Sequence, residues 1–236
     1  MFADNVVVAH RGAFKKNGLP ENSIAALREA IRLKCTGSEF DVHMSADDVL
    51  LVNHDPHYAG LDIEKTTYQQ LAATKLSNGE VLPTLREYLI EGLRNNTSTQ
   101  LVLEIKPSAS KERGRLIAER VMQLVKEMKA EKMVTYISFD YGILKRLEEL
   151  DKTAITQYLN GEIPPRQLKA DGIDGADYHF SVFKKHPEWI AEAKQEGILL
   201  NAWTVNEEAD MQWLLSQKFD FITTNELELL FSILKK

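Results

Sequence analysis

Residues 101–139 read LVLEIKPSASKERGRLIAERVMQLVKEMKAEKMVTYISF and contain one complete strand–helix–strand unit. The apolar run at 101–106 has the length of a buried strand, and the stretch 110–130 repeats its apolar residues at helical spacing. A second strand-like run follows at 133–139. A unit of this kind is typical of two parallel strands that are joined by a helical crossover.

The same alternation extends along the chain. Further strand-like runs lie at 5–10, 38–44, 154–159, 172–178, 198–205 and 219–224, and further helical patterns lie at 21–34, 139–150, 186–197, 206–217 and 225–236. Asn22 or Ser23 is placed to cap the first of these helices. About eight alternations in 236 residues predict an α/β protein with a TIM (β/α)8 barrel. A doubly wound open sheet is the alternative, but it usually has fewer strands and a glycine-rich loop after the first one.

One stretch departs from the alternation. Between an apolar extension at 49–55 and a helical pattern at 82–93 lies a polar segment with one short helical pattern, TTYQQLAATK (66–75). We interpret residues 55–82, roughly, as a short insertion after the second strand region. With this insertion included, residues 1–236 are predicted to form a single domain.

The composition excludes several classes of protein. Hydrophobic residues make up 44% and charged residues 27% of the chain, as in an ordinary globular protein. A net charge of −6 without any Lys/Arg block argues against a nucleic-acid partner. No apolar run approaches the roughly 20 residues of a membrane span, and the first residues, MFADNVVVAH, lack the features of a secretory signal. The single Cys35 cannot form an internal disulfide, which favours a reducing compartment. Together these features predict a cytoplasmic protein without a stable membrane anchor.

Chemically active side chains gather where the predicted strands end. In a barrel of this class the active site lies at the carboxyl ends of the strands. Those ends carry His10, Arg11, Glu39, Asp41, His43, His54, Glu104, Lys106 and Trp203. This concentration of ionisable groups predicts an active site at that end of the barrel.

Three acidic residues are central to this prediction. Residues two apart in a strand share a face, so Glu39 and Asp41 point the same way, as do Glu104 and Lys106. Buried carboxylates need a cation or hydrogen-bond donors, and Lys106 alone does not neutralise three of them. A divalent cation would, and oxygen-only ligands favour Mg²⁺ or Ca²⁺ over zinc. The alternative is that the carboxylates only form salt bridges with Arg11 and Lys106 across the barrel mouth.

Two histidines are candidates for acid–base catalysis. His10 follows the first strand and His54 follows the 49–55 extension, which suggests a general base and a general acid on opposite sides of a substrate. His43 shares its strand face with Asp41, and we expect it either to join the site or to support it from behind. The remaining histidines, in polar loops or at a helix start, are interpreted as surface residues: His57, His179 and His186.

An ordered succession of short motifs resembles the glycerophosphodiester phosphodiesterase family. The matching segments are AHRG (9–12), PENS (20–23), EFDVHMS (39–45), LVNHDP (51–56), LPTLREYL (82–89), LEIKP (103–107), ISFD (137–140) and AWTVN (202–206). Together they cover nearly the whole chain. The resemblance implies a TIM barrel that hydrolyses glycerophosphodiesters to sn-glycerol 3-phosphate and an alcohol, with Mg²⁺ or Ca²⁺ as cofactor.

The resemblance also implies a role for each candidate residue. It assigns catalysis to His10 and His54, phosphate or substrate binding to Arg11, Lys106 and Trp203, and the metal site to Glu39, Asp41 and Glu104. Glu21 is implied near the site, where it would orient Arg11 or a histidine. The family favours His10 as base and His54 as acid, but the sequence alone does not order them. It also leaves open whether water attacks phosphorus directly or a glycerol hydroxyl attacks first to give a cyclic phosphate.

Two segments depart from the family pattern. The usual T-x-D-G turn reads SADD (45–48), with Asp48 in place of glycine, and the usual TD-x-P after the last strand reads TTNELE (223–228). We expect the first departure to affect only a turn. The second puts a contact on the substrate side in question.

Three other functions remain as alternatives: a lysophospholipase D-like phosphodiesterase, a catalytically silent barrel that binds phosphodiesters, and a metal-dependent sugar isomerase or lyase. The lack of an apolar anchor disfavours the first of them, and the presence of every expected histidine and carboxylate disfavours the second. The pairing of His10 with His54 disfavours the third. A small-molecule glycerophosphodiester is therefore the predicted partner, while its head group and the oligomeric state are not predicted.

Overall fold

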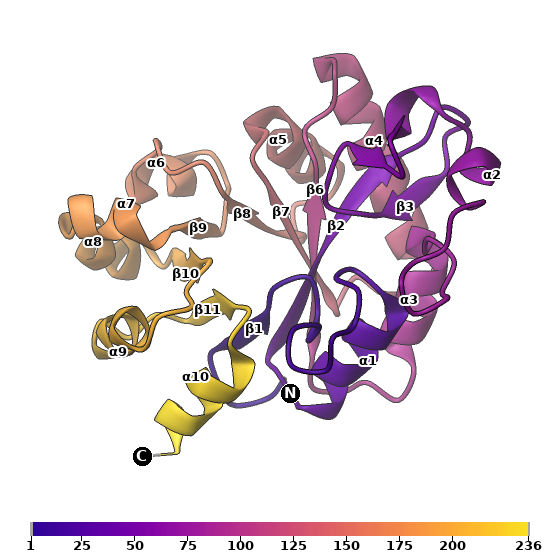
Figure 1. The fold of residues 1–236 in the computed structure, drawn as a ribbon. Helices are drawn as coiled ribbons and strands as arrows, with labels where there is room; N and C mark the ends of the chain where they lie inside the picture. Colours follow the sequence, from indigo (N-terminus) through magenta and orange to yellow (C-terminus); the bar gives the residue numbers. More distant parts are fainter. Residues whose placement is uncertain (1, 236) are drawn as a thin grey trace.

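Eight parallel strands close into a barrel with helices on its outside (Figure 1). The computed structural model describes residues 2–235. The barrel strands are β1 (Val7–Ala9), β2 (Gly37–Met44), β6 (Gln100–Ile105), β7 (Val134–Ser138), β8 (Ile155–Tyr158), β9 (Gly175–His179), β10 (Leu199–Trp203) and β11 (Phe221–Thr224). Because β1 pairs with both β11 and β2, the sheet closes into a ring. The predicted TIM (β/α)8 barrel is confirmed.

The predicted helices follow the strands along the chain. They are α1 (Ile24–Arg32), α3 (Leu85–Leu93), α4 (Lys111–Glu127), α5 (Tyr141–Leu150), α8 (Glu188–Glu196), α9 (Glu208–Ser216) and α10 (Leu227–Leu234). Two further helices, α6 (Pro165–Ala170) and α7 (Phe180–Lys185), were not predicted, because such short helices hold too few repeats for the periodicity to be recognised. In residues 2–235 there is no helix whose length and apolar character would let it cross a membrane.

Apolar side chains pack on both faces of the barrel wall. Successive strand residues face opposite sides, so Val7 points outward into the large core beneath the helices, while Val8 points into the barrel. Inside the barrel, Val8 joins Val102, Ile137 and Leu159 in a small apolar cluster. This cluster fills only part of the interior, and inward positions nearer the carboxyl ends of the strands carry polar side chains.

The polar segment after β2 forms a small layer beside the barrel. β3 (Leu50–Val52) pairs antiparallel to β2. It is followed by β4 (His57–Tyr58), β5 (Leu61–Asp62), the 3-10 helix η1 (Ile63–Lys65) and α2 (Tyr68–Leu71). Leu51, Ile63, Leu71 and Leu82 give this layer an apolar cluster of its own.

One carboxylate fastens this layer to the barrel. Glu80 accepts hydrogen bonds from the backbone N–H groups of Ile24, at 2.9 Å, and Ala25, at 3.1 Å. These are first-turn donors of α1 that have no partner inside the helix, and the negative charge lies at the positive end of the helix dipole. The contact therefore ties the end of this layer to the N-terminus of α1.

The N-terminus of α1 separates the two candidate capping residues. Ser23 caps the helix, since its side chain accepts a hydrogen bond from the backbone N–H of Ala26 at 3.0 Å. Asn22 lies just before the cap with a positive φ of 59°, and its side chain points to Asp41 instead. Asp48, which stands where the family pattern has glycine, also has a positive φ, of 60°, a conformation that Asp adopts more readily than most residues.

Candidate active site

Three carboxylates converge inside the barrel near the carboxyl ends of two paired strands. Glu39 and Asp41 project from the same face of β2, and Asp41 pairs in register with Glu104 on β6. All three side chains are buried, with residue exposures of 3%, 1% and 7%. Each offers an oxygen atom, and these atoms lie within 4.8 Å of one another. The strand spacing in the sequence predicted this convergence.

The charges in this cluster do not balance. Lys106 Nζ forms ion pairs with Asp41 Oδ1 at 3.2 Å and with Glu104 Oε1 at 2.8 Å. Burial and the neighbouring carboxylates raise the pKa of Glu39 well above its usual range, and burial with the charge of Asp41 raises the pKa of Glu104 to about 7. Burial works against ionisation of Asp41 as well, but Lys106 and Asn22 lower its pKa. Without further positive charge, burial therefore disfavours the ionised forms of Glu39 and Glu104.

The cluster fits a divalent cation. It offers carboxylate oxygens and no sulfur or nitrogen ligand, which is the ligand set that Mg²⁺ and Ca²⁺ prefer. Glu104 Oε1 is buried and lies 2.8 Å from Lys106 Nζ, the same ammonium group that Asp41 uses, so two of the three carboxylates share one cation. A bound cation would supply the missing positive charge.

Arg11 lies beside the carboxylates in a strained backbone conformation. Its φ is 54°, and its backbone N–H donates a hydrogen bond to Glu39 Oε2 at 2.8 Å. Its guanidinium Nη1 donates to both oxygens of Glu21, at 3.0 and 2.9 Å. Arg11 Nε is buried, lies 3.8 Å from Asp41 Oδ2 and has no hydrogen-bond partner. The Glu21 contact therefore holds the guanidinium while one of its donors stays free.

The next residue in the chain must be glycine. Gly12 has a φ of 79°, and its N–H donates to the Glu39 carbonyl at 3.1 Å. A Cβ at this position would lie 2.8 Å from the backbone of Ala26. No other residue type would allow α1 to approach β1 so closely.

Asn22 is a site residue that the sequence analysis missed. Its Nδ2 donates to Asp41 Oδ2 at 2.8 Å, and its Oδ1 accepts from the backbone N–H of Asp41 at 3.1 Å. This two-point contact fixes the Asp41 side chain. The only signal in the sequence was the PENS motif, which the resemblance linked to Glu21 rather than to the asparagine.

His10 is held as a neutral imidazole. Its Nδ1 lies 2.9 Å from Asn225 Oδ1, and the backbone N–H of Asn225 donates to Asn206 Oδ1 at 3.0 Å. An amide oxygen can only accept, so Nδ1 carries the proton and Nε2 is left as a base. Burial, together with the charge of Arg11, lowers the pKa of His10 to about 4. Asn225 lies in the segment TTNELE (223–228), where the sequence departs from the family pattern. Through Asn225 this segment contacts His10.

His54 lines the same cavity in a different environment. Its Nδ1 lies 2.7 Å from Asp55 Oδ1, and its side chain is 33% exposed. His43 lies behind it, with Nε2 at 3.1 Å from the His54 carbonyl oxygen. Burial lowers the pKa of His43. His43 therefore contacts the backbone that carries His54, while Asp55 contacts its ring.

A cavity of about 130 Å³ joins these groups. One side is charged and includes His10, Arg11, Glu39, His54, Glu104 and Lys106. The opposite side is largely apolar and includes Ile137, Phe139, Leu159 and Trp203. The rings of Phe139 and Trp203 meet edge to face at 5.4 Å, and Trp203 Nε1 donates to the Asp177 carbonyl at 2.8 Å. His179, interpreted as a surface residue, packs edge to face on Trp203 at 5.4 Å.

Asp177 is a second residue that the sequence analysis missed. Its carboxyl group lies on the cavity wall, buried at 2% exposure, and Oδ1 has no hydrogen-bond partner. Burial, with the charge of Glu104, raises its pKa well above the usual range. In the sequence it is one polar residue within the strand-like run 172–178, where nothing indicated the direction of its side chain.

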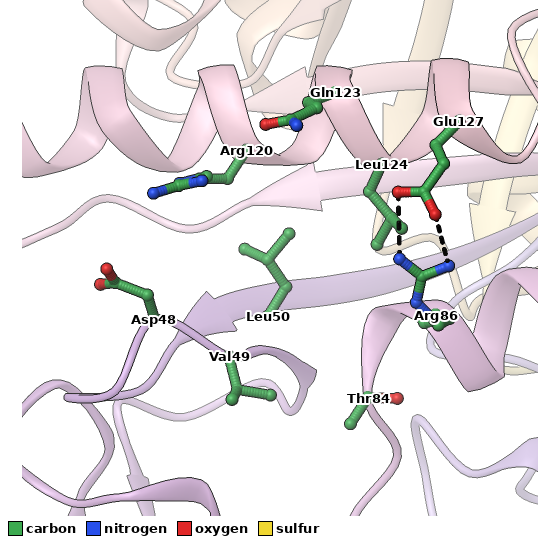
Figure 2. Close-up of a pocket in the computed structure, with 9 residues that line it drawn as sticks. All are labelled: Asp48, Val49, Leu50, Thr84, Arg86, Arg120, Gln123, Leu124 and Glu127. Carbon is green, nitrogen blue, oxygen red and sulfur yellow. Dashed lines mark hydrogen bonds and ion pairs between the residues drawn. The ribbon is translucent and has the colours of Figure 1, made fainter.

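A larger hollow, the outer groove, lies between the start of β3 and helices α3 and α4 (Figure 2). Its volume is about 340 Å³. It is lined by Asp48, Val49, Leu50, Thr84, Arg86, Arg120, Gln123, Leu124 and Glu127. Arg86 Nη1 and Glu127 Oε1 form an ion pair at 3.0 Å. None of the sequence-predicted site residues lies among these lining residues.

Comparison with known proteins agrees with this geometry. Residues 10–229 match the glycerophosphoryl diester phosphodiesterase family. The glycerophosphodiester phosphodiesterase of Caldanaerobacter subterraneus subsp. tengcongensis is 28% identical over 246 residues, which cover 98% of each chain. A crystal structure of a glycerophosphodiester phosphodiesterase from Parabacteroides distasonis is 40% identical, with a TM-score of 0.95 over 100% of this chain and 98% of that one.

A third relative shares the fold at lower identity. A phosphodiesterase from Oleispira antarctica, solved in complex with the product sn-glycerol-3-phosphate, is 21% identical. It superposes with a TM-score of 0.85 over 98% of this chain and 97% of that one. At this level of identity the similarity concerns the barrel itself.

Proposed function

The chain belongs to the glycerophosphoryl diester phosphodiesterase family, and we propose that it hydrolyses small glycerophosphodiesters to sn-glycerol 3-phosphate and an alcohol with a bound divalent cation. Membership makes it a phosphoric diester hydrolase. The cation, the product and the roles of individual residues are the proposed parts. The observation that supports them most is the meeting of a buried oxygen-only carboxylate cluster with Arg11 and two histidines in one cavity.

The cation would be held by Glu39, Asp41 and Glu104. When bound, it would supply Lewis-acid stabilisation of the charge that develops on the phosphoryl oxygens. Mg²⁺ and Ca²⁺ both suit the oxygen ligands. The burial of three carboxylates around one lysine is the feature of this chain that favours a metal site over a cluster of salt bridges.

Arg11 and Lys106 would bind the phosphate group. Arg11 has a buried Nε donor without a hydrogen-bond partner. Its guanidinium is held by the ion pair with Glu21, so little side-chain entropy remains to be lost when phosphate binds. Lys106 adds a positive charge beside the carboxylates. Both would stabilise the negative charge at phosphorus more strongly in the transition state than in the ground state.

His10 would act as the base and His54 as the acid. His10 is neutral, with Nε2 available to take the proton of the attacking hydroxyl group as the new P–O bond forms. His54 would donate a proton to the alcohol oxygen as its bond to phosphorus breaks, and Asp55 would stabilise the charged imidazolium before that transfer. The more exposed position of His54 suits the side from which an alcohol of variable structure departs. Trp203 would pack on the glycerol carbons.

Release of sn-glycerol 3-phosphate tests this proposal directly. We expect the protein to release it from glycerophosphocholine and glycerophosphoethanolamine in the presence of Mg²⁺ or Ca²⁺. Chelation should abolish release and renewed addition of the cation should restore it. Turnover that survives complete chelation would refute the metal site, and the absence of any release would refute the proposed substrate class.

A further inference from the structure

Among the ionisable groups that line the cavity, the carboxyl group of Asp177 is the one to which the proposed mechanism gives no role. It projects from the middle of β9 into the barrel, at 2% exposure, and no described donor reaches its Oδ1. Lys106 is paired with Asp41 and Glu104, and Arg11 with Glu21. None of the ion pairs that Lys106 and Arg11 form in the described structure involves Asp177.

A buried carboxyl oxygen without a partner destabilises the fold. This cost arises because the oxygen loses its hydrogen bond to water on folding and gains no other. A hydrophobic residue would fit the apolar wall formed by Ile137, Leu159 and Phe139 without that cost. A ligand group that donates a hydrogen bond would satisfy the oxygen, which makes Asp177 a candidate for substrate recognition.

The position of Asp177 defines which part of the substrate it meets. Its own backbone carbonyl accepts the hydrogen bond from Trp203 Nε1, and both residues line the cavity in which Trp203 would cover the glycerol carbons. Two residues earlier on the same strand face, a Cβ at Gly175 would lie 2.6 Å from Gln157 Cγ. Gln157 therefore fills the barrel below, and the cavity is closed at the level of Asp177.

The closed end suits the constant half of the substrate. The departing alcohol must be able to leave and varies between substrates, so it belongs at the open side near His54. Glycerol is common to all of these substrates, and its terminal hydroxyl is the donor farthest from phosphorus. With the phosphate on Arg11 and Lys106, as proposed above, that hydroxyl would point toward the opposite wall, where Asp177 supplies the carboxyl group.

We propose that Asp177 is a specificity-determining residue whose carboxyl oxygen accepts a hydrogen bond from the terminal glycerol hydroxyl of the substrate. This inference rests on the proposed function and adds a substrate requirement to it. A lysophospholipid carries an acyl group on that hydroxyl, so it has no proton to donate there and no space below Asp177 for its chain. Asp177 would thereby restrict the enzyme to fully deacylated glycerophosphodiesters.

The test compares two substrates on three enzymes. The substrates are glycerophosphoethanolamine and its deoxy analogue, in which hydrogen replaces the terminal glycerol hydroxyl. In the wild-type protein we expect kcat/KM to be roughly 10- to 100-fold lower for the analogue, the effect of one hydrogen bond to a buried polar group. Asp177→Val should lose activity on the natural substrate and reduce this ratio to near one. Asp177→Asn keeps an acceptor oxygen and should retain most of the preference.

The ratio of the two substrates separates recognition from folding. A partly misfolded variant loses both activities by the same factor and keeps the ratio. If Asp177→Val keeps the wild-type ratio, the carboxyl group acts through Glu104 or on the fold, and the inference is overturned. An Asp177→Asn ratio as low as that of Asp177→Val would also overturn the acceptor role.

Lysophosphatidylethanolamine provides the second arm. The wild-type protein should hydrolyse it much more slowly than it hydrolyses glycerophosphoethanolamine. Efficient hydrolysis would contradict the inference that the cavity is closed at the level of Asp177. Failure of the wild-type protein to release sn-glycerol 3-phosphate from glycerophosphoethanolamine is a different result. It would refute the proposed function and this inference together.

Discussion

The barrel cavity and the outer groove are both hollows lined by arginine and carboxylate side chains, but they treat these charges differently. The groove is the larger, about 340 Å³ against about 130 Å³. Its ion pair between Arg86 and Glu127 has side chains that are 52% and 57% exposed (Figure 2). In the cavity, Glu39, Asp41 and Glu104 are withdrawn from water and share a single lysine.

This difference shows that the burial of charged groups and their lack of partners, not the size of the hollow, identify the site. An exposed ion pair is solvated whether or not it forms, and it contributes little to stability. Buried carboxylates without enough partners are costly, so a fold that keeps them needs a compensating ligand or reaction. Substitutions in the cavity should therefore change activity greatly and stability little or favourably, while substitutions in the groove should change neither.

The largest effect is expected for Glu39→Ala. Loss of a proposed metal ligand should lower turnover by about two to four orders of magnitude, the range for lost electrostatic or acid–base catalysis. Added Mg²⁺ or Ca²⁺ should raise the melting temperature of the wild-type protein by mass action but not that of the variant. Glu127→Ala, which removes a carboxylate from the groove, is the matched control. Normal turnover by a folded Glu39→Ala protein would contradict the assignment.

The two histidines should respond differently to the leaving group. We expect His54→Ala to lose roughly 10²- to 10⁴-fold in activity on glycerophosphocholine, because the choline alkoxide needs a proton to depart. A p-nitrophenyl ester of glycerol phosphate needs no such proton, so this variant should hydrolyse it nearly as well as the wild-type protein. His10→Ala should be impaired on both substrates, measured as kcat. The opposite pattern would exchange the two roles.

The pKa of His10 should set the acid limit of activity, and a substitution at Asn225 should move it. The low pKa of His10, about 4, keeps it unprotonated and able to act as a base from neutral pH down toward that value, and activity that needs this base is lost as pH falls through it. Asn225→Asp places a carboxylate beside Nδ1, which stabilises the imidazolium and raises its pKa. The acid limb of the kcat/KM–pH profile should therefore move upward by about one pH unit or more.

The control for this pH shift is Asn225→Ala, which removes the hydrogen bond without adding charge. It should lower activity while the acid limb does not move upward. An acid limb that stays in place in Asn225→Asp would show that His10 does not govern it.

The smallest effect is expected in the groove. Arg86→Ala and Glu127→Ala should each change the free energy of unfolding by less than about 1 kcal/mol, because the pair is exposed. A double-mutant cycle in urea would measure their coupling, and turnover should stay at the wild-type level. A large loss of activity in either variant would break the distinction between the two hollows.

The sequence predicted the barrel and part of the site for a simple reason. The eight strand-like runs correspond to the eight barrel strands, because apolar runs and helical spacing are local properties of the chain. The facing of Glu39, Asp41 and Glu104 also followed from local information, since alternation along a strand sets the direction of each side chain. The short helices α6 and α7 were not predicted, because six residues are too few to show a helical spacing of apolar side chains.

The parts that were missed depend on contacts between distant segments. Asn22 and Asn225 acquire their roles from the side chains opposite them, Asp41 and His10. Asp177 lies in a run that could have faced the helices or the interior, and only closure of the barrel turned it toward the cavity. Residue type alone did not distinguish these asparagines and this aspartate from ordinary turn, cap or surface residues.

The sequence by itself therefore determined the order of strands and helices, the end of the barrel where ionisable groups gather, and the family to which those motifs belong. The tertiary structure alone decided which charges are left without partners, how each histidine is held, and where the cavity ends. The physical reason is the separation along the chain over which each effect acts. Periodicity and strand alternation act within a few residues, whereas burial and hydrogen-bond satisfaction depend on segments that meet only when the sheet closes.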